Sequence, residues 1–402
     1  MQTKHLESNL PEAAELLRQG GLVAVPTETV YGLAGNGLDE KAVEKIYEVK
    51  GRPQVKPLSL MVPGPEALDM YSEEVPAQAR KLADCFWPGP LTLVLKAKPS
   101  IPEIVRAGGA TIGLRCPDHP LTLALLQEAG IPFAAPSANP SGEESPKTCQ
   151  QVLAYFDGRI DAVIDGGPCG IGKESTLLDM SQTPYRVLRQ GALPEKRIAE
   201  ALAENTIRIG ITGGTGCGKT TALLCLQKRG ALILDCDEVY HQLLNTSKEL
   251  LSELDAQFPG VVEGGELQRK KLGAIVFANP QALQRLNEIT HRHIREEIQR
   301  RICKFAMDGG QLVAIDAIEL ISSGLAETCQ AVVGIVADTE TRIQRIVARD
   351  GISNEYARMR VEAQRPNSYF EENCDYTLEN NGDMESFSRE FDQMMEEIIN
   401  NG

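Results

Sequence analysis

A glycine-rich run near the middle of the chain constrains the fold more than any other feature. It reads Gly210-Ile-Thr-Gly-Gly-Thr-Gly-Cys-Gly-Lys-Thr-Thr221, and it follows an apolar, strand-like segment at Ile207–Ile211. Residues 213–220 fit the phosphate-loop pattern G-x-x-x-x-G-K-[ST]. A loop of this kind directs several backbone N–H groups toward one point, where the dipole of the following helix adds positive potential. Lys219 adds a charge and Thr220 offers a hydroxyl to Mg²⁺, so the sequence predicts a nucleoside triphosphate site.

The length and composition predict two soluble domains. The chain has 402 residues, of which 42% are hydrophobic and 24% are charged, and single cores rarely grow beyond roughly 250–300 residues. No run of about 18 apolar residues is present, so we expect no membrane span, and the N-terminus lacks the apolar core of a signal peptide. The ten cysteines form no C-x-x-C pair. This usage predicts free thiols in a reducing cytoplasm.

The charge argues against a general nucleic-acid-binding protein. The net charge is −15 and neither half is net basic, whereas binding to nucleic acid without sequence preference needs a basic surface. A local basic cleft remains compatible with this balance. We expect the two halves to join within Pro184–Asn205, which gives domains at residues 1–203 and 206–402.

The second half alternates apolar strands with amphipathic helices, which predicts a parallel α/β sheet. Strands are expected at Ile207–Ile211, Ala231–Asp235, Leu312–Asp316 and Ala331–Ala337, with helices at Thr220–Arg229, Ser247–Phe258 and Pro280–Asp308. Ligands in such sheets bind beyond the carboxyl ends of the strands, so Asp235 and Asp237 should face the phosphate loop. There a carboxylate can accept a proton or hold Mg²⁺ through water. The alternative is that both residues cap the next helix.

Beyond the loop, the second half resembles the dephospho-coenzyme A kinase family over essentially all of residues 207–395. The ordered motifs are Thr212-Gly-Gly-Thr-Gly-Cys-Gly-Lys-Thr-Thr221, Asp235-Cys-Asp237, Leu267-Gln-Arg-Lys-Lys-Leu-Gly-Ala-Ile-Val-Phe277, His291-Arg-His-Ile-Arg295, Asp338-Thr-Glu-Thr-Arg-Ile-Gln-Arg345 with Arg349, Gln364, and Cys374-Asp-Tyr-Thr-Leu-Glu-Asn-Asn-Gly382. The resemblance implies a P-loop kinase domain with a parallel sheet and a helical substrate and lid region. It implies ATP-dependent phosphorylation of the ribose 3′-hydroxyl of dephospho-coenzyme A.

The same resemblance assigns roles to individual residues. Asp237 would be the general base, with Lys219 and Arg345 also catalytic. The nucleotide would be bound by Thr215, Gly216, Cys217, Gly218, Lys219, Thr220 and Arg349, and Mg²⁺ by Thr220 and Asp237. Arg269, His291 and Arg295 would bind the acceptor. The arginines can also be read as one solvated helix face, because i and i+4 positions share a side. Two stretches depart from the family pattern, Asp316-Ala-Ile-Glu-Leu-Ile321 and Phe370.

The first half also mixes strands and helices, but less regularly. Strands are expected at Gly21–Pro26, Leu91–Lys96, Thr111–Arg115, Phe133–Pro136 and Ala162–Asp165, with helices at Glu40–Lys50 and Pro120–Ala129. Proline-bounded strands and long connections predict a mixed, twisted sheet. Hydroxyls and cations recur at the strand ends. They are Thr27, Lys50, Arg52, Lys56, Arg115, Ser137, Asn139, Ser145, Ser175 and Arg189. Judged singly, they would be residues of solvated loops and turns.

Together these residues resemble the threonylcarbamoyl-AMP synthase family, with its YrdC-type domain, over residues 15–191. The motifs are Gly21-Leu-Val-Ala-Val-Pro-Thr-Glu-Thr-Val-Tyr-Gly-Leu33, Lys50-Gly-Arg-Pro53, Trp87-Pro-Gly-Pro-Leu-Thr-Leu93, Ile112-Gly-Leu-Arg-Cys-Pro-Asp-His-Pro120, Pro136-Ser-Ala-Asn-Pro-Ser-Gly142, Glu174-Ser-Thr176 and Leu188-Arg-Gln-Gly191. The implied reaction joins L-threonine, bicarbonate and ATP into threonylcarbamoyl-AMP and pyrophosphate. A tRNA threonylcarbamoyl transferase complex would consume the product.

By position in this family, ATP would be contacted by Lys50, Gln54, Thr111, Ser137, Asn139, Ser145 and Arg189. Threonine would be held by Thr27, Ser59, Arg115, Ala135 and Ser175, with Arg115 as a forked donor to its carboxylate. Ser59 departs from the family, in which histidine is frequent near that place. Without an obvious base, catalysis would rest on positioning and on charge stabilisation by Lys50, Arg52 and Arg189, aided by Mg²⁺.

Two functions therefore remain open for the whole chain. The first is a bifunctional enzyme in which an adenylate-forming half is fused to a 3′-hydroxyl kinase. The second makes the first half a non-catalytic RNA-binding module that tethers the kinase near RNA. The acidic balance and the absence of interleaved aromatic and basic residues argue against the second, although weak RNA contact remains compatible with a basic cleft.

Overall fold

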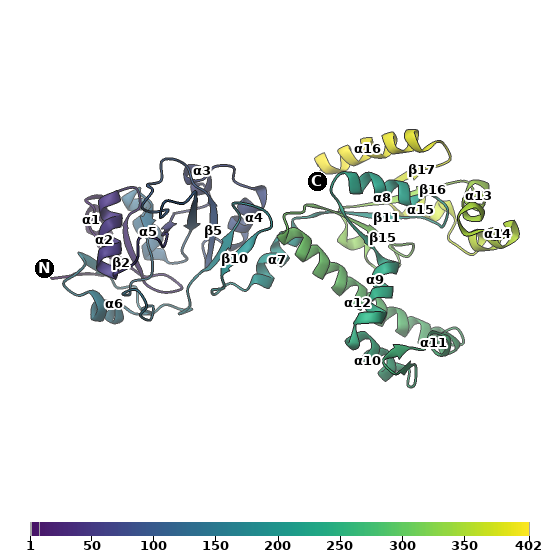
Figure 1. The fold of residues 1–402 in the computed structure, drawn as a ribbon, viewed down its shortest axis with the longest axis horizontal. Helices are drawn as coiled ribbons and strands as arrows, with labels where there is room; N and C mark the ends of the chain where they lie inside the picture. Colours follow the sequence, from purple (N-terminus) through teal and green to yellow (C-terminus); the bar gives the residue numbers. More distant parts are fainter. Residues whose placement is uncertain (1, 8, 402) are drawn as a thin grey trace. The chain divides into compact units, whose positions relative to one another are not determined.

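The computed structural model describes residues 2–7 and 9–401 and divides them into two compact units (Figure 1). Unit 1 comprises Met1–Asn205 with Met307–Gly309, and unit 2 comprises Thr206–Ala306 with Gly310–Gly402. Within the described residues, no helix combines the length and the apolar character that a membrane crossing requires. Because the two units are separate bodies, each is described by itself.

Unit 1 is built on a ten-stranded mixed sheet in the order β1-β8-β2-β3-β7-β4-β6-β5-β9-β10. The strands are β1 (Lys4–Leu6), β2 (Val23–Val25), β3 (Gly32–Asn36), β4 (Ser59–Met61), β5 (Leu91–Lys96), β6 (Thr111–Arg115), β7 (Phe133–Ala134), β8 (Ala162–Ile164), β9 (Thr176–Asp179) and β10 (Arg186–Arg189). The helices are α1 (Leu10–Arg18), α2 (Glu40–Lys50), α3 (Ala67–Tyr71), α4 (Ala77–Phe86), α5 (Pro120–Ala129), α6 (Cys149–Phe156) and α7 (Glu195–Glu204). Parallel and antiparallel pairs coexist, as the sequence predicted.

Local signals explain where the helices of unit 1 begin and end. Asp39 caps α2 by accepting a hydrogen bond from the backbone of Lys41, and Gly51 ends the helix in the left-handed region with φ of 59°. Apolar faces of α1 and α5 pack with β2, β7 and β8 into one core. That core includes Leu17, Val23, Val25, Leu125, Phe133 and Ile164. The polar residues at the ends of the strands lie outside this core and are available to form a site.

The expected join is part of unit 1. Within Pro184–Asn205, residues 186–189 form strand β10, which pairs antiparallel with β9, and residues 195–204 form helix α7. Apolar residues of this stretch, such as Ile198 and Leu202, are buried, which the proline and glycine content did not reveal. The strand expected at Phe133–Pro136 is also shorter, because pairing ends at Ala134.

Unit 2 is built on a five-stranded sheet in the order β12-β15-β11-β16-β17, in which every pair is parallel. The strands are β11 (Ile207–Thr212), β12 (Leu232–Asp235), β15 (Leu312–Asp316), β16 (Ala331–Val336) and β17 (Tyr376–Glu379), and β13 (Val262–Glu263) pairs separately with β14 (Glu266–Leu267). The α-helices are α8 (Lys219–Lys228), α9 (Cys236–Thr246), α10 (Lys248–Gln257), α11 (Arg269–Val276), α12 (Pro280–Met307), α13 (Thr339–Asp350), α14 (Asn354–Glu362), α15 (Asn367–Asn373) and α16 (Met384–Asn401). A short 3₁₀ helix spans Ala326–Thr328.

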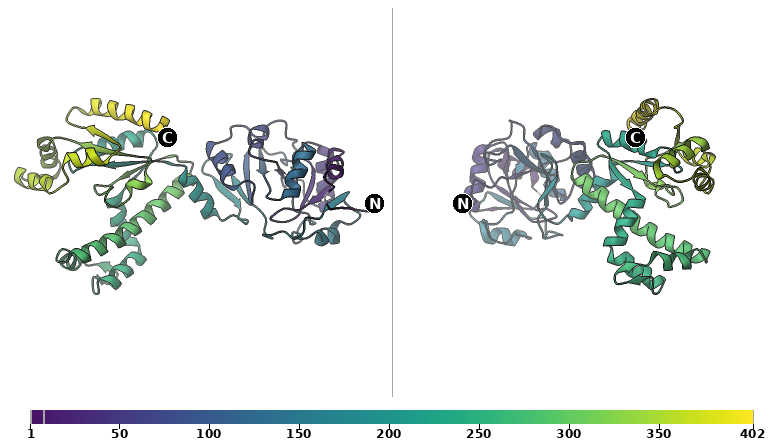
Figure 2. Two further views of the ribbon diagram at one scale, coloured as in Figure 1. Left: turned by 180° about the vertical axis from the view of Figure 1, so that it is seen from behind. Right: turned by 45° about the vertical axis from the view of Figure 1, so that its right-hand side comes forward.

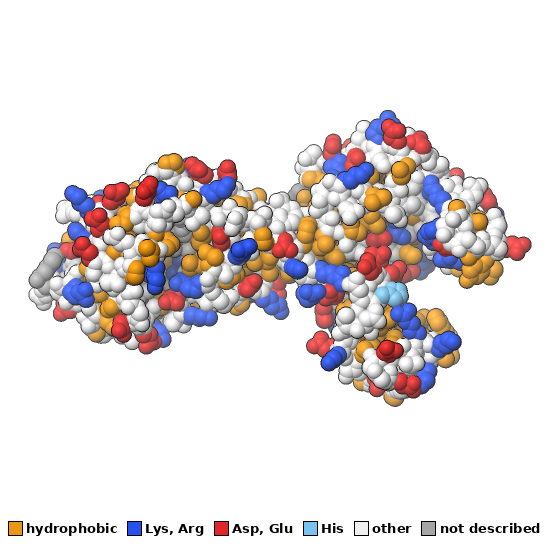
Figure 3. Space-filling view, in the orientation of Figure 1, with side chains coloured by type: hydrophobic (Ala, Val, Ile, Leu, Met, Phe, Trp, Pro, Cys, Tyr) orange, Lys and Arg blue, Asp and Glu red, His pale blue; other side chains and the backbone are white. Residues whose placement is uncertain are grey.

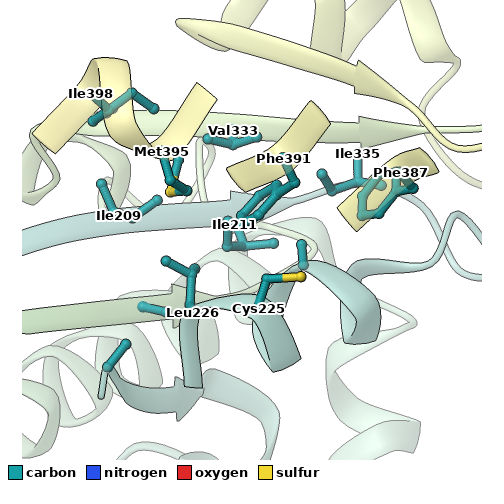
Figure 4. Packing of buried hydrophobic residues seen from close by; sticks show 14 of the residues in the cluster. Ile209, Ile211, Cys225, Leu226, Val333, Ile335, Phe387, Phe391, Met395 and Ile398 are labelled. Atoms are coloured by element: carbon teal, nitrogen blue, oxygen red, sulfur yellow. The ribbon is translucent and has the colours of Figure 1, made fainter. Parts of the chain in front are cut away.

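Helices α8 and α16 pack together over the central strands of this sheet. Figure 4 shows Phe387, Phe391 and Met395 of α16 directed at Ile211 and its neighbours, and these residues are almost fully buried. The rings of Phe387 and Phe391 stack with centroids 6.1 Å apart. Burial of a large apolar side chain stabilises the fold by about 1.5–3 kcal/mol, so this cluster fixes β11 and the loop that follows it.

A helical arm of α9–α12 has a core of its own, which includes Leu250, Leu254, Phe258, Leu272 and Ile289. Figures 1 and 2 show α10 and α11 beside the far half of α12, away from the sheet. Helices α13 and α14 pack against each other around Ile343, Ile346 and Ala357. The expected helical regions are therefore present, and they flank the carboxyl ends of the strands.

Candidate active sites

The first candidate site is a cleft in unit 1 between β3, β4, β6 and the segment that leads to β9. Several predicted residues line this cleft together: Arg52, Ser59, Arg115, Ala135, Ser137, Ser175 and Arg189. These residues are far apart in the sequence, since Arg52 and Arg189 are separated by 137 positions. β4 pairs parallel with β6, whereas β5 pairs antiparallel with β6 and parallel with β9, so the carboxyl end of β6 lies at the edge where β5 and β9 begin. The sheet topology therefore assembles the cleft.

Arg115, at the end of β6, is held by an internal ion pair. Its Nη2 lies 2.7 Å from Oε1 of Glu28 and also donates to Thr29 Oγ1 at 2.9 Å, while its Nε donates to the carbonyl of Gly89. Both charged side chains are nearly buried, with exposed fractions of 8% and 12%. Among the described residues, no hydrogen bond reaches Nη1. Nη1 is therefore the terminal nitrogen that remains for a ligand, and forked donation by Arg115 to a threonine carboxylate stays a prediction.

The other end of the cleft is ordered by Arg189 and Ser175. The guanidinium donates twice to the backbone carbonyl of Ser175, and the hydroxyl of Ser175 is 2.8 Å from Thr92 Oγ1. The hydroxyl of Ser145 donates to Glu174 at 2.8 Å, and Glu174 lines the cleft. Burial lowers the pKa of Arg189, and Glu174 opposes that shift. Arg52 lines the same cleft, close enough for its charge to interact with that of Arg189.

Lys50, the last residue of α2, is buried behind the cleft. Its ammonium donates to the backbone carbonyls of Ser137 and Asn139 and so fixes the Pro136–Pro140 turn. Burial lowers the pKa of Lys50 to about 7, and the nearby Arg52 lowers it further. The structure thus shows Lys50 as an organiser of the turn that carries Ser137, one step behind the lining residues.

Three further predicted residues lie elsewhere in unit 1. Thr27 is buried and its hydroxyl donates to the carbonyl of Val30, Thr111 begins β6 at the opposite end from Arg115, and Gln54 is exposed on a turn. Five residues separate the ends of β6 by roughly 13 Å at the rise of a strand. Thr27, Thr111 and Gln54 are therefore not among the described residues that line the cleft.

Asn139 is the remaining predicted residue of unit 1. Its amide nitrogen donates to the carbonyls of Pro140 and Glu143, whereas Oδ1 is buried with no hydrogen-bond partner among the described residues. A buried acceptor without a partner is costly. It is therefore a candidate acceptor for a donor group of a bound molecule.

The second candidate site is the phosphate loop of unit 2. It connects β11 to α8, which begins at Lys219, and Gly213 and Gly218 have φ of 140° and 94°. A Cβ at these positions would lie 2.2 Å from the Ile335 carbonyl and 2.1 Å from the Asn380 side chain. Only glycine fits this course of the backbone, in which the N–H groups before α8 face a common point.

The loop is clamped from the side by two residues. Arg342 of α13 donates to the Thr215 carbonyl at 3.0 Å and to Gln364 at 2.6 Å. Gln364 in turn accepts from the Thr215 N–H at 2.8 Å and donates to its hydroxyl at 2.7 Å. Arg342 is only 3% exposed. The sequence prediction included Gln364 in a motif but did not single out Arg342, because a buried arginine and a surface arginine look alike in a helix pattern.

Three carboxylates face the loop across the cleft: Asp235, Asp237 and Asp316. Asp235 and Asp316 are register partners at the ends of β12 and β15. Asp235 caps α9 by accepting from the backbone of Asp237 and Glu238, so the capping alternative holds for Asp235, while Asp237 lines the cleft. The ammonium of Lys219 lies 3.7 Å from Asp316 Oδ1.

Asp316 is the carboxylate that sequence reasoning missed as a site residue. Its Oδ1 is buried without a hydrogen-bond partner among the described residues. Burial raises the pKa of Asp316 to about 6, Lys219 opposes the rise, and the other two aspartates add to it. A set of carboxylates beside the Thr220 hydroxyl matches the oxygen ligands that Mg²⁺ prefers. The residues present therefore fit a bound magnesium ion.

Arginines close the other side of this cleft. Arg345 lies within 3.4 Å of the carbonyls of Gly216 and Cys217, and Arg349 and Arg360 are both paired with Asp350. All three arginines line the cleft together with Thr215, Gly216, Gly218 and Thr220. Arg360 comes from α14 and was missed by the sequence prediction. Cys217 is almost fully buried and points into the core.

A neighbouring cavity shares Asp237, Ala317 and Ile318 with the phosphate cleft. Its other lining residues are Cys236, Tyr240, Thr290, His291, Ile294, Glu319, Ser323 and Leu325. Burial lowers the pKa of His291, Arg295 lowers it further, and Glu319 opposes the shift. Arg295 donates to the Ser323 carbonyl and lines a groove beyond His291. Arg269 opens α11, beside Tyr240 rather than in the cavity wall.

The two departures from the kinase pattern occupy different places. Glu319 lines the cavity beside the phosphate cleft, and Phe370 is buried in the core. Figure 3 shows acidic and basic side chains interspersed over the visible face of each unit.

Comparison with known proteins identifies two families. A model of Sua5/YciO/YrdC proteins, described as telomere recombination, matches residues 15–191, and a model of dephospho-CoA kinase (CoaE) matches residues 207–386. Threonylcarbamoyl-AMP synthase of Pyrococcus abyssi is 44% identical over 201 residues, which are 50% of this chain and 59% of that protein. The Bacillus subtilis protein of the same name is 46% identical over 200 residues, 49% of this chain and 58% of that protein.

The chain thus spans less than two thirds of the length of these two relatives. A third relative is covered almost completely: threonylcarbamoyl-AMP synthase of Halorhodospira halophila is 36% identical over 173 residues, which are 43% of this chain and 91% of that protein. The first half of the chain therefore belongs to the Sua5/YciO/YrdC family of threonylcarbamoyl-AMP synthases, and the second half matches the dephospho-CoA kinase family model.

Proposed function

We propose that the chain is a bifunctional enzyme. Unit 1 would form threonylcarbamoyl-AMP from L-threonine, bicarbonate and ATP, and unit 2 would transfer the γ-phosphoryl group of ATP to the ribose 3′-hydroxyl of dephospho-CoA. The observation that carries this proposal is that each unit has its own cleft in which cations and hydroxyls from separate elements meet. The family membership of both halves supports it.

In unit 1 the threonine amine and bicarbonate combine to a carbamate with loss of water. A carbamate oxygen then attacks the α-phosphorus of ATP, the bond from that phosphorus to the bridging oxygen breaks, and pyrophosphate leaves. Arg115 lines the cleft, and its Nη1, which has no hydrogen-bond partner among the described residues, would bind the threonine carboxylate. Arg52 and Arg189 would stabilise the negative charge that develops on the phosphates.

Lys50 and Asn139 would act on ATP from behind the lining residues. Lys50 holds the turn that carries Ser137, so that the hydroxyl and the backbone of this turn are fixed before the nucleotide arrives. The unpartnered Oδ1 of Asn139 would accept a hydrogen bond from the nucleotide. Positioning of this kind accelerates the reaction even without a catalytic base.

In unit 2 Asp237 would take the proton of the acceptor hydroxyl, because it lies where the phosphate cleft and the neighbouring cavity meet. Lys219, Arg345 and Arg349 would stabilise the transferring phosphoryl group. Thr220, Asp237 and Asp316 would hold Mg²⁺, which supplies charge neutralisation at the phosphates when it is bound. The apolar wall of Tyr240, Ile294 and Leu325 would pack against dephospho-CoA.

The product of unit 1 is a mixed anhydride and is therefore prone to hydrolysis. We expect a tRNA threonylcarbamoyl transferase to accept its threonylcarbamoyl group, and we propose that both activities take place in the cytoplasm. The two reactions share ATP alone among their substrates, so the proposal requires no transfer of intermediates between the units.

The proposal is tested by incubating the purified chain with ATP and either threonine and bicarbonate or dephospho-CoA. We expect pyrophosphate release that depends on both threonine and bicarbonate, and CoA formation that depends on dephospho-CoA. Salt-sensitive RNA binding by the chain, with no threonine-dependent pyrophosphate, would instead support the RNA-binding module for unit 1.

A further inference from the structure

Three potential metal ligands meet at one edge of the unit 1 sheet, separate from the residues that line its cleft. His5 lies in β1, Cys149 is the first residue of α6, and Asp165 directly follows β8. β1 pairs parallel with β8, with His5 opposite Val163. Alternate residues of a strand share a face, so His5 and Asp165 lie diagonally on one side of the pair. Helix α6 packs against β8 and places Cys149 above them.

The ligand atoms are close enough to share one ion. Nε2 of His5 lies 3.2 Å from Sγ of Cys149 and 3.9 Å from Oδ2 of Asp165, and all three atoms lie within 4.8 Å of one another. Tetrahedral zinc with bonds of about 2.0–2.3 Å requires ligand atoms roughly 3.3–3.7 Å apart. The Nε2–Sγ separation lies just below this range and the Nε2–Oδ2 separation just above it, so the imidazole is close to the geometry that a shared ion requires.

The surroundings orient two of the ligands. The other carboxylate oxygen of Asp165 accepts from the backbone of Gly167 at 3.0 Å, which leaves Oδ2 directed at the cluster. Thr148 caps α6 through Gln151, so the first turn that carries Cys149 is fixed. Hydrogen bonds to the remaining atoms of ligands are typical of protein metal sites, because they hold each ligand in place.

One ligand of the cluster is buried and another is exposed to solvent, which suits a site that takes up a metal ion. Cys149 is 1% exposed, whereas the side chain of His5 is 47% exposed. A divalent cation would stabilise a thiolate and a carboxylate together at this position. The exposed histidine leaves a route for the ion and room for water as a fourth ligand.

We propose that His5, Cys149 and Asp165 bind a divalent ion of the zinc class, which ties the short edge strand β1 to β8 and α6. The thiolate, imidazole and carboxylate set favours zinc over magnesium or calcium, which prefer oxygen ligands. The role is structural: binding releases the thiol proton to solvent and involves no redox step. This proposal does not depend on either proposed activity.

The test uses the full chain, freed of metal with a chelator and then titrated with Co²⁺ and Zn²⁺. We expect one equivalent of Co²⁺ to produce a thiolate-to-cobalt charge-transfer band that Zn²⁺ abolishes, and Zn²⁺ to raise the Tm of unit 1, because a ligand of the folded state stabilises it. Cys149→Ser should remove the band and weaken Zn²⁺ binding by at least about 10- to 100-fold. Cys169→Ser is the matched control, since Cys169 lies in the same unit outside the cluster, and it should keep both.

His5→Gln provides a second variant should Cys149→Ser fold poorly, because His5 is exposed on an edge strand. It should lower Zn²⁺ affinity by a similar factor while circular dichroism stays unchanged. A wild-type chain that binds no Zn²⁺ would overturn the proposal. Equal Zn²⁺ binding by the wild type and both cluster variants would also overturn it, because the ion would then lie elsewhere.

Discussion

The two units prepare a surface for phosphate in different ways. Unit 2 uses one contiguous loop, residues 213–220, whose backbone N–H groups and Lys219 face a cleft with three aspartates. Unit 1 gathers arginines and serines from β4, β6, β10 and several loops into its cleft, and its lysine lies behind the wall. The cleft of unit 2 therefore combines cations with carboxylates, whereas unit 1 has a cationic cleft whose nearby carboxylates are tied to Arg115 and Ser145.

This difference shows what each kind of site demands of its fold. A loop motif needs one strand and one helix, so its geometry is largely local. A dispersed site needs a complete sheet, because a shift in any strand moves one of its members. Chemistry at unit 2 should consequently depend on single residues, and chemistry at unit 1 on the joint placement of several.

The largest expected effect is at the proposed base of unit 2. Asp237→Asn removes the proton acceptor and should lower CoA formation by about 10²–10⁴-fold, while threonine-dependent pyrophosphate release stays unchanged. Steady-state rates of both reactions on the same preparation measure this. Glu238→Gln, at the next position of α9, is the matched control and should retain activity. A near-normal rate for Asp237→Asn would make this residue a structural carboxylate.

The loop lysine should have the next largest effect. Lys219→Ala removes a charge that faces the phosphates and Asp316, and it should lower phosphoryl transfer by about 10²–10³-fold. Lys228→Ala, at the far end of α8, should leave transfer intact. If Lys219→Ala abolished pyrophosphate release as well, the two clefts would not be independent, and the comparison between them would fail.

A smaller effect is expected at Arg115 in unit 1. Arg115→Lys keeps the charge but cannot satisfy Gly89, Thr29 and Glu28 while also facing the cleft. We expect the KM for threonine to rise by about 10- to 100-fold, the range of one or two hydrogen bonds to a charged group, with little change in the KM for ATP. Arg80→Lys, in an exposed pair with Asp69, should change neither. Equal increases in both KM values would indicate a general loss of structure.

The smallest expected effects are those of pH, and they differ in direction between the two units. The pKa of Lys50 is lowered to about 7 by burial, so its ammonium loses charge as the pH rises through 7. ATP affinity of unit 1 should therefore fall above pH 7, by at most about tenfold per pH unit. Lys50→Arg, which stays charged, should flatten this profile. A KM for ATP that is constant from pH 6 to 9 would limit Lys50 to holding its turn.

Unit 2 should respond in the opposite direction. The pKa of Asp316 is raised to about 6 by burial, so the carboxylate becomes protonated as the pH falls through 6 and would then hold Mg²⁺ less well. CoA formation at limiting Mg²⁺ should decline below pH 6, and excess Mg²⁺ should restore it. An acid limb that excess Mg²⁺ leaves unchanged would contradict a role for Asp316 in binding the ion.

The sequence predicted the parts of the molecule that depend on local patterns. The phosphate loop, the parallel sheet of unit 2 and the mixed sheet of unit 1 follow from glycine spacing and from apolar runs. Asp316 was not predicted as a site residue because its importance comes from pairing with Asp235, 81 positions earlier, in a register that only the folded sheet defines. Contacts of long sequence separation leave no local signature.

The same reason explains why the sequence could not predict which unit 1 residues line the cleft. Lys50 reaches Ser137 across 87 positions, and Arg115 is held by Glu28 across another 87. Motif similarity placed all of them in one site, but it did not distinguish lining residues from those behind the wall. Thr111 and Arg115 lie on one strand, yet at its opposite ends.

The central claim is that two independent nucleotide sites share one polypeptide. It is tested most directly by supplying ATP, threonine, bicarbonate and dephospho-CoA together and resolving the products by mass for the wild type, Lys219→Ala and Arg189→Ala. We expect the wild type to make both threonylcarbamoyl-AMP and CoA, Lys219→Ala only the former, and Arg189→Ala only the latter. Loss of both products in either variant, or a wild type that makes CoA alone, would contradict the claim.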